Sequence, residues 1–66
     1  MENLTKREHD IVKLLVLGKS NHQIAEELFI SVHTVKASLE RIYDKTGIHS
    51  RVLLALSYAK QYNYFL

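Results

Sequence analysis

Apolar and polar residues recur along the chain with the period of an α-helix, in four successive segments. Each segment follows a serine or threonine, whose hydroxyl can accept a backbone N–H group of a first helical turn. Gly18 and Gly47 follow the first and third segments, where a glycine in the left-handed conformation can close a helix. The pattern predicts an all-α fold with helices at about 6–17, 21–28, 32–46 and 51–62.

The segment between Ser31 and Gly47 has two faces, and the other segments are interpreted around it. A stripe that must face a core recurs at helical spacing: Val35, Leu39, Ile42 and Thr46. The opposite face carries polar groups around one small residue: His33, Lys36, Ala37, Glu40 and Asp44. Because a helix about 10–12 Å wide fits the roughly 12 Å major groove of B-DNA, we interpret this segment as a recognition helix. The alternative is a solvated polar face on an ordinary bundle helix.

The first two helices carry the same capping signal and lead into the third through a short turn. The capping-box spacing, in which two side chains satisfy each other's backbone amides, occurs twice: Thr5 with Glu8 and Ser20 with Gln23. We expect the first helix to bury a wide apolar face: Ile11, Val12, Leu14, Leu15 and Leu17. The short turn between the second and third helices gives the outline of a helix-turn-helix motif.

The fourth helix is apolar on nearly all sides. Its predicted inward residues are Leu54, Ala55 and Tyr58. They leave a second apolar stripe with helical spacing: Val52, Leu56 and Ala59. A domain this small cannot cover both stripes by itself, so we expect a homodimer in which fourth helices pack together. The alternative is that the tail at 62–66 folds back over the second stripe.

Composition limits the class of protein. The chain has 66 residues, of which 47% are hydrophobic, and it contains no cysteine. These values predict a single domain over residues 1–66, without disulfides or a thiolate zinc site. The four histidines lack metal-ligand spacing, and neither a Gly-rich phosphate loop nor a Ser–His–Asp arrangement is present. We therefore expect no metal, no cofactor and no enzymatic activity.

The net charge of +2 is a mild basic bias, too weak to indicate nucleic acid by itself. The longest apolar runs, 14–17 and 52–56, are far too short to span a bilayer. The first ten residues are charged and polar and do not form a signal peptide. We expect a cytoplasmic protein that does not interact with membranes.

Three groups of residues form one continuous pattern over nearly the whole chain. Residues 4–8 read LTKRE, residues 18–36 read GKSNHQIAEELFISVHTVK, and residues 42–51 read IYDKTGIHSR. Together they resemble the LuxR/FixJ/GerE-type DNA-binding domain. The resemblance implies a four-helix helix-turn-helix bundle, whose third helix enters the major groove and whose fourth helix forms a two-fold dimer contact.

The resemblance also implies which site residues contact bases and which contact phosphates. It places base contacts on Lys36, Ala37 and Glu40. It places phosphate contacts on Ser20, Asn21, His33, Thr34 and Arg51. Further cationic candidates for phosphate contact are Lys19, Arg41 and Lys45.

Each assignment has an alternative, and the chain departs from the family pattern at three positions. Lys36, Glu40 and Asp44 could form a solvated ladder of side chains, and Asn21 could serve only to cap its helix. Three residues differ from the family's usual choice: Gln23 in place of Glu, Ser38 in place of a frequent His, and Thr46 in place of Leu. The last change is expected to weaken the final core contact of the third helix.

The predicted function is sequence-specific binding of double-stranded DNA as a two-fold dimer, with regulation of transcription as its purpose. RNA polymerase is a further candidate partner. The alternative is a protein-interaction module that keeps the helix-turn-helix fold without binding DNA. Both a stand-alone regulator and the C-terminal domain of a response regulator fit the sequence.

Overall fold

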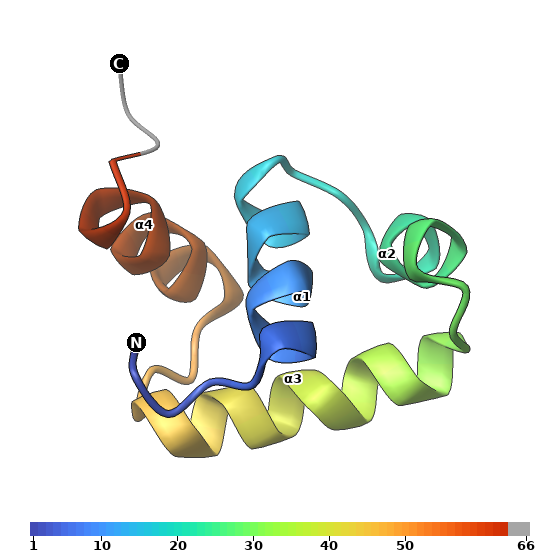
Figure 1. Ribbon diagram of the computed structural model, residues 1–66, viewed down its shortest axis with the longest axis horizontal. Helices are drawn as coiled ribbons and strands as arrows, with labels where there is room; N and C mark the ends of the chain where they lie inside the picture. The colour runs from blue at the N-terminus through green and yellow to red at the C-terminus, as the bar shows by residue number, and fades with distance from the viewer. Residues whose placement is uncertain (64–66) are drawn as a thin grey trace.

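The computed structural model describes residues 1–63, and within them the chain forms four α-helices and no strand (Figure 1). The helices are α1 (Lys6–Val16), α2 (Asn21–Leu28), α3 (Val32–Thr46) and α4 (Arg51–Gln61). In Figure 1, α1 stands between α4 and α2, and α3 runs across the lower edge of all three. The predicted all-α fold is confirmed.

Side-chain caps determine where the helices begin. At α1 the Thr5 hydroxyl accepts the Glu8 amide at 3.1 Å, and the Glu8 carboxylate accepts the Thr5 amide at 2.8 Å. Ser20 and Gln23 make the same exchange at α2, at 3.2 and 2.8 Å. Both predicted capping boxes are therefore present, and they satisfy amides that a helix start leaves without intrahelical partners.

The ends of the helices differ from the predicted ends by one residue in two places. Leu17 and Tyr62 are C-cap residues, so α1 ends at Val16 and α4 at Gln61. The expectation that Leu17 widens the buried face of α1 is wrong, since this side chain is 67% exposed. The reason is geometric: Leu17 lies beyond the last helical residue, just before Gly18 turns the chain with a φ of +80°.

The corner between α2 and α3 contains a left-handed residue that is not glycine. Phe29 has a φ of +57° and lies at the C-cap of α2. The Ile30 amide then donates back to the Ala25 carbonyl at 3.0 Å, which makes the corner tight. The Phe29 side chain is 94% exposed, so the corner presents an aromatic ring beside the start of α3.

All four helices contribute to one apolar core. The fully buried side chains come from every helix: Ile11, Val12, Ile24, Val35, Ile42, Leu54 and Tyr58. Helix α1 packs against both α4 and α3, while α2 packs against α3. The Tyr58 hydroxyl and His9 Nδ1 lie 2.8 Å apart, so a hydrogen bond joins α4 to α1 inside this core.

One buried carboxylate connects α1 to the second half of α3. Glu8 is only 4% exposed, and its Oε1 accepts a hydrogen bond from Lys45 Nζ at 2.7 Å. Arg41 Nε lies 3.9 Å from the other carboxylate oxygen. Burial by itself raises the pKa of Glu8, but the hydrogen bonds from Lys45 and Thr5 outweigh it, so the pKa lies below 4.5. The folded domain therefore holds Glu8 as a carboxylate at neutral pH.

Candidate nucleic-acid interface

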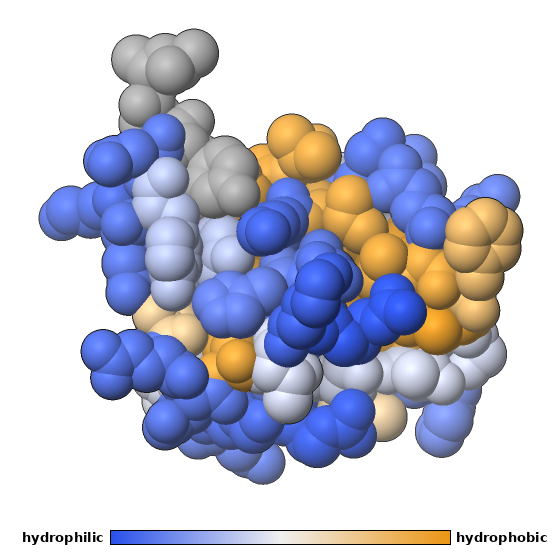
Figure 2. Space-filling model, in the orientation of Figure 1, coloured by the Kyte–Doolittle hydropathy of each residue, from blue (hydrophilic) through white to orange (hydrophobic). Residues whose placement is uncertain are grey.

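The third helix has a buried face and an open face. Val35, Leu39 and Ile42 are buried in the core, as the sequence predicts. On the opposite side Lys36 and Glu40 are exposed and Ala37 is half-buried between them. Figure 2 shows hydrophilic residues along much of the lower edge of the molecule, where α3 runs in Figure 1. The three residues predicted to contact bases are therefore accessible to a large partner.

Two residues of α3 that depart from the family pattern have polar partners inside the domain. Ser38 is 3% exposed, and its hydroxyl accepts a hydrogen bond from Arg41 Nη2 at 3.1 Å. The Thr46 hydroxyl donates to the Ile42 carbonyl at 2.8 Å and accepts the Ile48 amide at 3.2 Å. Thr46 thus closes the turn after α3 through hydrogen bonds, instead of extending the apolar stripe.

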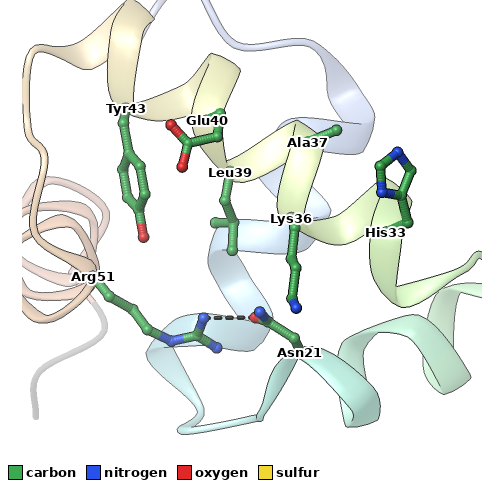
Figure 3. A pocket seen from close by; sticks show the side chains of 8 residues that line it. All are labelled: Asn21, His33, Lys36, Ala37, Leu39, Glu40, Tyr43 and Arg51. Carbon is green, nitrogen blue, oxygen red and sulfur yellow. Dashed lines mark hydrogen bonds between the residues drawn. The ribbon is translucent and has the colours of Figure 1, made fainter.

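An open groove of about 410 Å³ lies between α3 and the first residues of α2 and α4 (Figure 3). Its lining is Asn21, His33, Lys36, Ala37, Leu39, Glu40, Tyr43 and Arg51. The structure thus gathers all three predicted base-contact residues and three of the predicted phosphate-contact residues around one groove. Ser20 and Thr34, the other two, are exposed and lie at the first turns of α2 and α3.

The starts of α2 and α4 are joined at the edge of this groove. Arg51 Nη1 donates to Asn21 Oδ1 at 2.6 Å, and Arg51 Nη2 donates to the Lys19 carbonyl at 3.0 Å. Figure 3 shows the Arg51 side chain reaching from α4 to Asn21, on the same side of α3 as the Lys36 side chain. Lys19 itself has its ammonium 3.8 Å from Glu27 on α2.

The sequence interpretation did not identify Tyr43 as a site residue. Its half-buried ring extends from α3 along the groove with the hydroxyl on the side of Arg51 (Figure 3). The signal that could have revealed it is spacing, because Lys36, Glu40 and Tyr43 follow each other at i, i+4 and i+7 on one helix face. A phenolic hydroxyl can donate to a phosphate oxygen.

Two cations that the sequence offered as phosphate contacts are engaged elsewhere. Arg41 and Lys45 both approach the buried carboxylate of Glu8, at 3.9 and 2.7 Å. The sequence interpretation treated Glu8 only as part of a cap and did not identify this contact. The single negative charge of Glu8 is thus shared by two cations within the bundle, and neither cation lines the groove.

The apolar surface of α4 differs from the predicted stripe by one residue. Val52 and Leu56 are 67% and 47% exposed, and their neighbour Leu53 is 57% exposed. Ala59 is only 3% exposed, so its prediction as an interface residue is wrong for the folded domain. At 100° per residue Ala59 lies at the boundary of the two faces, where larger neighbours cover a methyl group. The exposed surface is Val52, Leu53 and Leu56, called the α4 apolar face below.

Residues 1–63 contain neither a membrane-spanning helix nor a cluster of metal ligands. Within this range no helix combines the length and apolar character needed to cross a lipid bilayer. The same residues contain no group of three His, Asp or Glu side chains that could hold a metal ion. The alternative for α4 places the tail at 62–66 over its second stripe, and residues 64–66 of this tail lie outside the described residues.

Two helices joined by a tight corner, with the second exposed along a polar face, define a helix-turn-helix domain. Residues 2–58 match the family model of the bacterial regulatory proteins of the luxR family. The chain belongs to this family, whose members are DNA-binding regulators and not enzymes.

The chain is similar to part of several longer bacterial proteins. It is 48% identical over 59 residues to the fimbriae Z protein of Escherichia coli K12, covering 89% of this chain and 28% of that protein. It is 44% identical over 55 residues to the transcriptional regulatory protein LiaR of Bacillus subtilis, covering 83% and 26%. It is 38% identical over 61 residues to a nitrate/nitrite response regulator protein homolog of Haemophilus influenzae, covering 92% and 29%. The chain therefore spans less than a third of the length of each of these relatives.

Proposed function

We propose that this domain binds double-stranded DNA in a sequence-specific manner as a two-fold dimer and regulates transcription. The observation that carries the proposal is the outer face of α3, which is polar, exposed and continuous with the groove. The luxR-family membership and the regulatory names of two of the relatives support the same function. In a bacterial cell such a protein acts in the cytoplasm, and RNA polymerase is a candidate partner there.

In this proposal the outer face of α3 around Lys36 and Glu40 contacts bases in the major groove. The Lys36 ammonium can donate to the O6 and N7 atoms of guanine, and the Glu40 carboxylate can accept from the N4 amino group of cytosine. Ala37 between them is small, which lets the helix backbone approach the base edges closely. Because Glu40 would also repel nearby phosphates, its place is against base edges in the middle of the groove.

Phosphate contacts fix the domain on the duplex and supply most of its affinity. The candidates are at the starts of helices, where backbone N–H groups and the helix dipole favour an anion: Ser20, Asn21, His33 and Thr34. Arg51, the fifth predicted residue, lies on the same groove in contact with Asn21. These five residues lie at the starts of α2, α3 and α4 and would contact the DNA backbone on one side of the major groove.

The α4 apolar face is the proposed dimer contact. A two-fold pair through this face would place the two α3 helices about one turn of DNA apart, roughly 34 Å. Leu56→Glu puts a charge into the centre of this face and should abolish association without unfolding the domain, as sedimentation and circular dichroism would show. Gln61→Glu on the same helix is the matched control, since Gln61 is exposed and projects about 140° away from Leu56 around the helix axis. Unaltered sedimentation of the Leu56 variant would contradict the dimer contact.

The proposal as a whole is tested by binding-site selection from random duplexes with purified protein. We expect enrichment of one sequence with approximate two-fold symmetry and half-sites about 10 base pairs apart. The selected duplex should also lose affinity steeply as salt rises. Recovery of random duplexes only, together with tight binding to a protein partner, would favour the interaction module that does not bind DNA.

A further inference from the structure

Arg51 could contribute to DNA binding at the groove in one of two ways: by binding a phosphate, or by holding another residue in place. It is the first residue of α4, and its guanidinium crosses to two acceptors at the beginning of α2. These acceptors, Asn21 Oδ1 and the Lys19 carbonyl, lie 2.6 and 3.0 Å from its two terminal nitrogens. The planar fork of a guanidinium is suited to two acceptors at once, which a lysine ammonium on a flexible stem cannot match.

This contact decides which way the Asn21 carboxamide faces. A guanidinium has donors only, so the Asn21 atom that meets Arg51 must be its carbonyl oxygen and not its amino group. The Asn21 amino group takes no part in this contact, and the residue is half-buried and lines the groove (Figure 3). An amide in this orientation offers a phosphate oxygen two N–H donors, whereas the reversed amide would offer a repelling oxygen.

We infer that Arg51 is a positioning residue, which fixes Asn21 as a phosphate donor, and not a phosphate ligand itself. The inference rests on the DNA binding proposed above and assigns the mechanism of one of its contacts. An asparagine already held in its binding rotamer has less side-chain freedom to lose when DNA arrives. Arg51 at the start of α4 would then affect DNA binding only by orienting Asn21 at the start of α2.

The two roles predict different salt dependences, because only ligands that are charged release counterions when they bind phosphate. The measurement is fluorescence anisotropy of a labelled duplex carrying the selected sequence, with salt from about 50 to 200 mM. We expect Asn21→Ala and Arg51→Ala to weaken binding by a similar factor, about 3- to 10-fold for one lost hydrogen bond. The double variant should be no weaker than either single variant, and the slope of affinity against salt should match that of the wild type.

Arg51→Lys gives the sharpest comparison, because it keeps the charge and loses the fork. A positioning role predicts that it binds as weakly as Arg51→Ala, and it remains informative should the alanine variant fold poorly. A direct phosphate contact predicts instead that lysine retains most of the affinity and that Arg51→Ala lowers the salt slope by about one. Either of these two results, or additive effects in the double variant, overturns the inference.

Two controls separate this inference from the proposed function. Lys13→Ala removes an exposed charge from α1, outside both the groove and the α4 apolar face, and reports what a change in net charge does by itself. Thermal unfolding of each variant reports whether the domain remains folded at the binding temperature. Wild-type protein that binds no duplex would refute the proposed function itself, whereas wild-type binding with a ligand-like Arg51 would refute only the positioning role.

Discussion

Both halves of α3 carry cations, but the two halves use them differently. In the first half Lys36 is exposed beside the groove, and the structure gives it no carboxylate partner within ion-pair distance among residues 1–63. In the second half Lys45 and Arg41 approach Glu8, which reaches them from α1. The difference between the halves is one buried counter-charge.

This comparison shows how a weakly basic domain can serve two purposes with few charges. A cation beside a buried carboxylate spares the bundle the cost of an unpaired buried charge. A cation without such a partner can displace counterions from a phosphate backbone. Because Glu8 lies beside the second half of α3, the cations of that half contact the bundle, whereas Lys36 in the first half is left to face a partner.

The largest expected effect follows from removing Glu8. Glu8→Ala deletes an acceptor of the capping box and the partner of Lys45, so it should lower the free energy of unfolding by about 2–3 kcal/mol. In a domain of this size that is a large part of the total stability. Urea unfolding followed by circular dichroism measures the change.

Glu8→Gln separates the two contributions of this side chain. The glutamine amide oxygen can still accept the Thr5 amide, as Gln23 does for Ser20 in α2. Only the charge is lost, and both cationic partners are partly solvated, so we expect a smaller cost of about 1 kcal/mol. A Glu8→Gln variant as stable as the wild type would show that the ion pairs between α1 and α3 contribute nothing, whereas equal losses for the two variants would assign the whole effect to these ion pairs.

Lys36→Ala and Lys45→Ala test the two halves of α3 with the same substitution. Lys36→Ala should weaken specific DNA binding by about 1–3 kcal/mol and leave stability within about 0.5 kcal/mol of the wild type. Lys45→Ala should do the reverse, with a loss of up to about 1 kcal/mol in stability and little change in DNA affinity. Anisotropy titrations and urea unfolding of both proteins provide the comparison. Similar effects on DNA binding would remove the distinction between the halves.

The contacts that the Glu8 carboxylate makes with the second half of α3 contribute to the free energy of unfolding, and this contribution depends on pH. Because the pKa of Glu8 is lower in the folded than in the unfolded chain, the contribution is complete above about pH 4.5 and is lost as pH falls through the folded value. The stability gap between wild type and Glu8→Gln should therefore be constant near neutral pH and shrink below about pH 4.5. Thermal unfolding across this range measures the gap, and a gap that widens in acid would contradict the assigned contact.

Sequence alone was sufficient for the parts of this domain that depend on local rules. Capping residues and helical periodicity predicted the four helices, because both act within a few residues of the chain. The outer face of α3 was also predictable, since a stripe such as Val35, Leu39 and Ile42 determines which residues lie opposite it. The resemblance to a family then gave roles to residues that periodicity only placed on a surface.

The features that the sequence did not predict all depend on contacts between distant segments. Glu8 and Lys45 are 37 positions apart, and Arg51 and Asn21 are 30 positions apart. No local pattern shows that such pairs will meet, so Arg51 and Lys45 were both interpreted as plain phosphate contacts. Ala59 was misassigned for a related reason: a helical projection gives its direction but not which neighbours cover it.

The smallest expected effect concerns Tyr43, which lies in the second half of α3 between Arg41 and Lys45 but lines the groove. Tyr43→Phe keeps the ring and removes only the hydroxyl, so stability should stay within about 0.5 kcal/mol of the wild type. If the hydroxyl donates to a phosphate, affinity for the selected duplex should fall about 2- to 5-fold, in line with one neutral hydrogen bond. The salt slope should not change, because no charge is removed. Unchanged affinity would show that the DNA-contacting surface of α3 does not extend beyond Glu40. A loss of stability would show that the Tyr43 hydroxyl contributes to the fold.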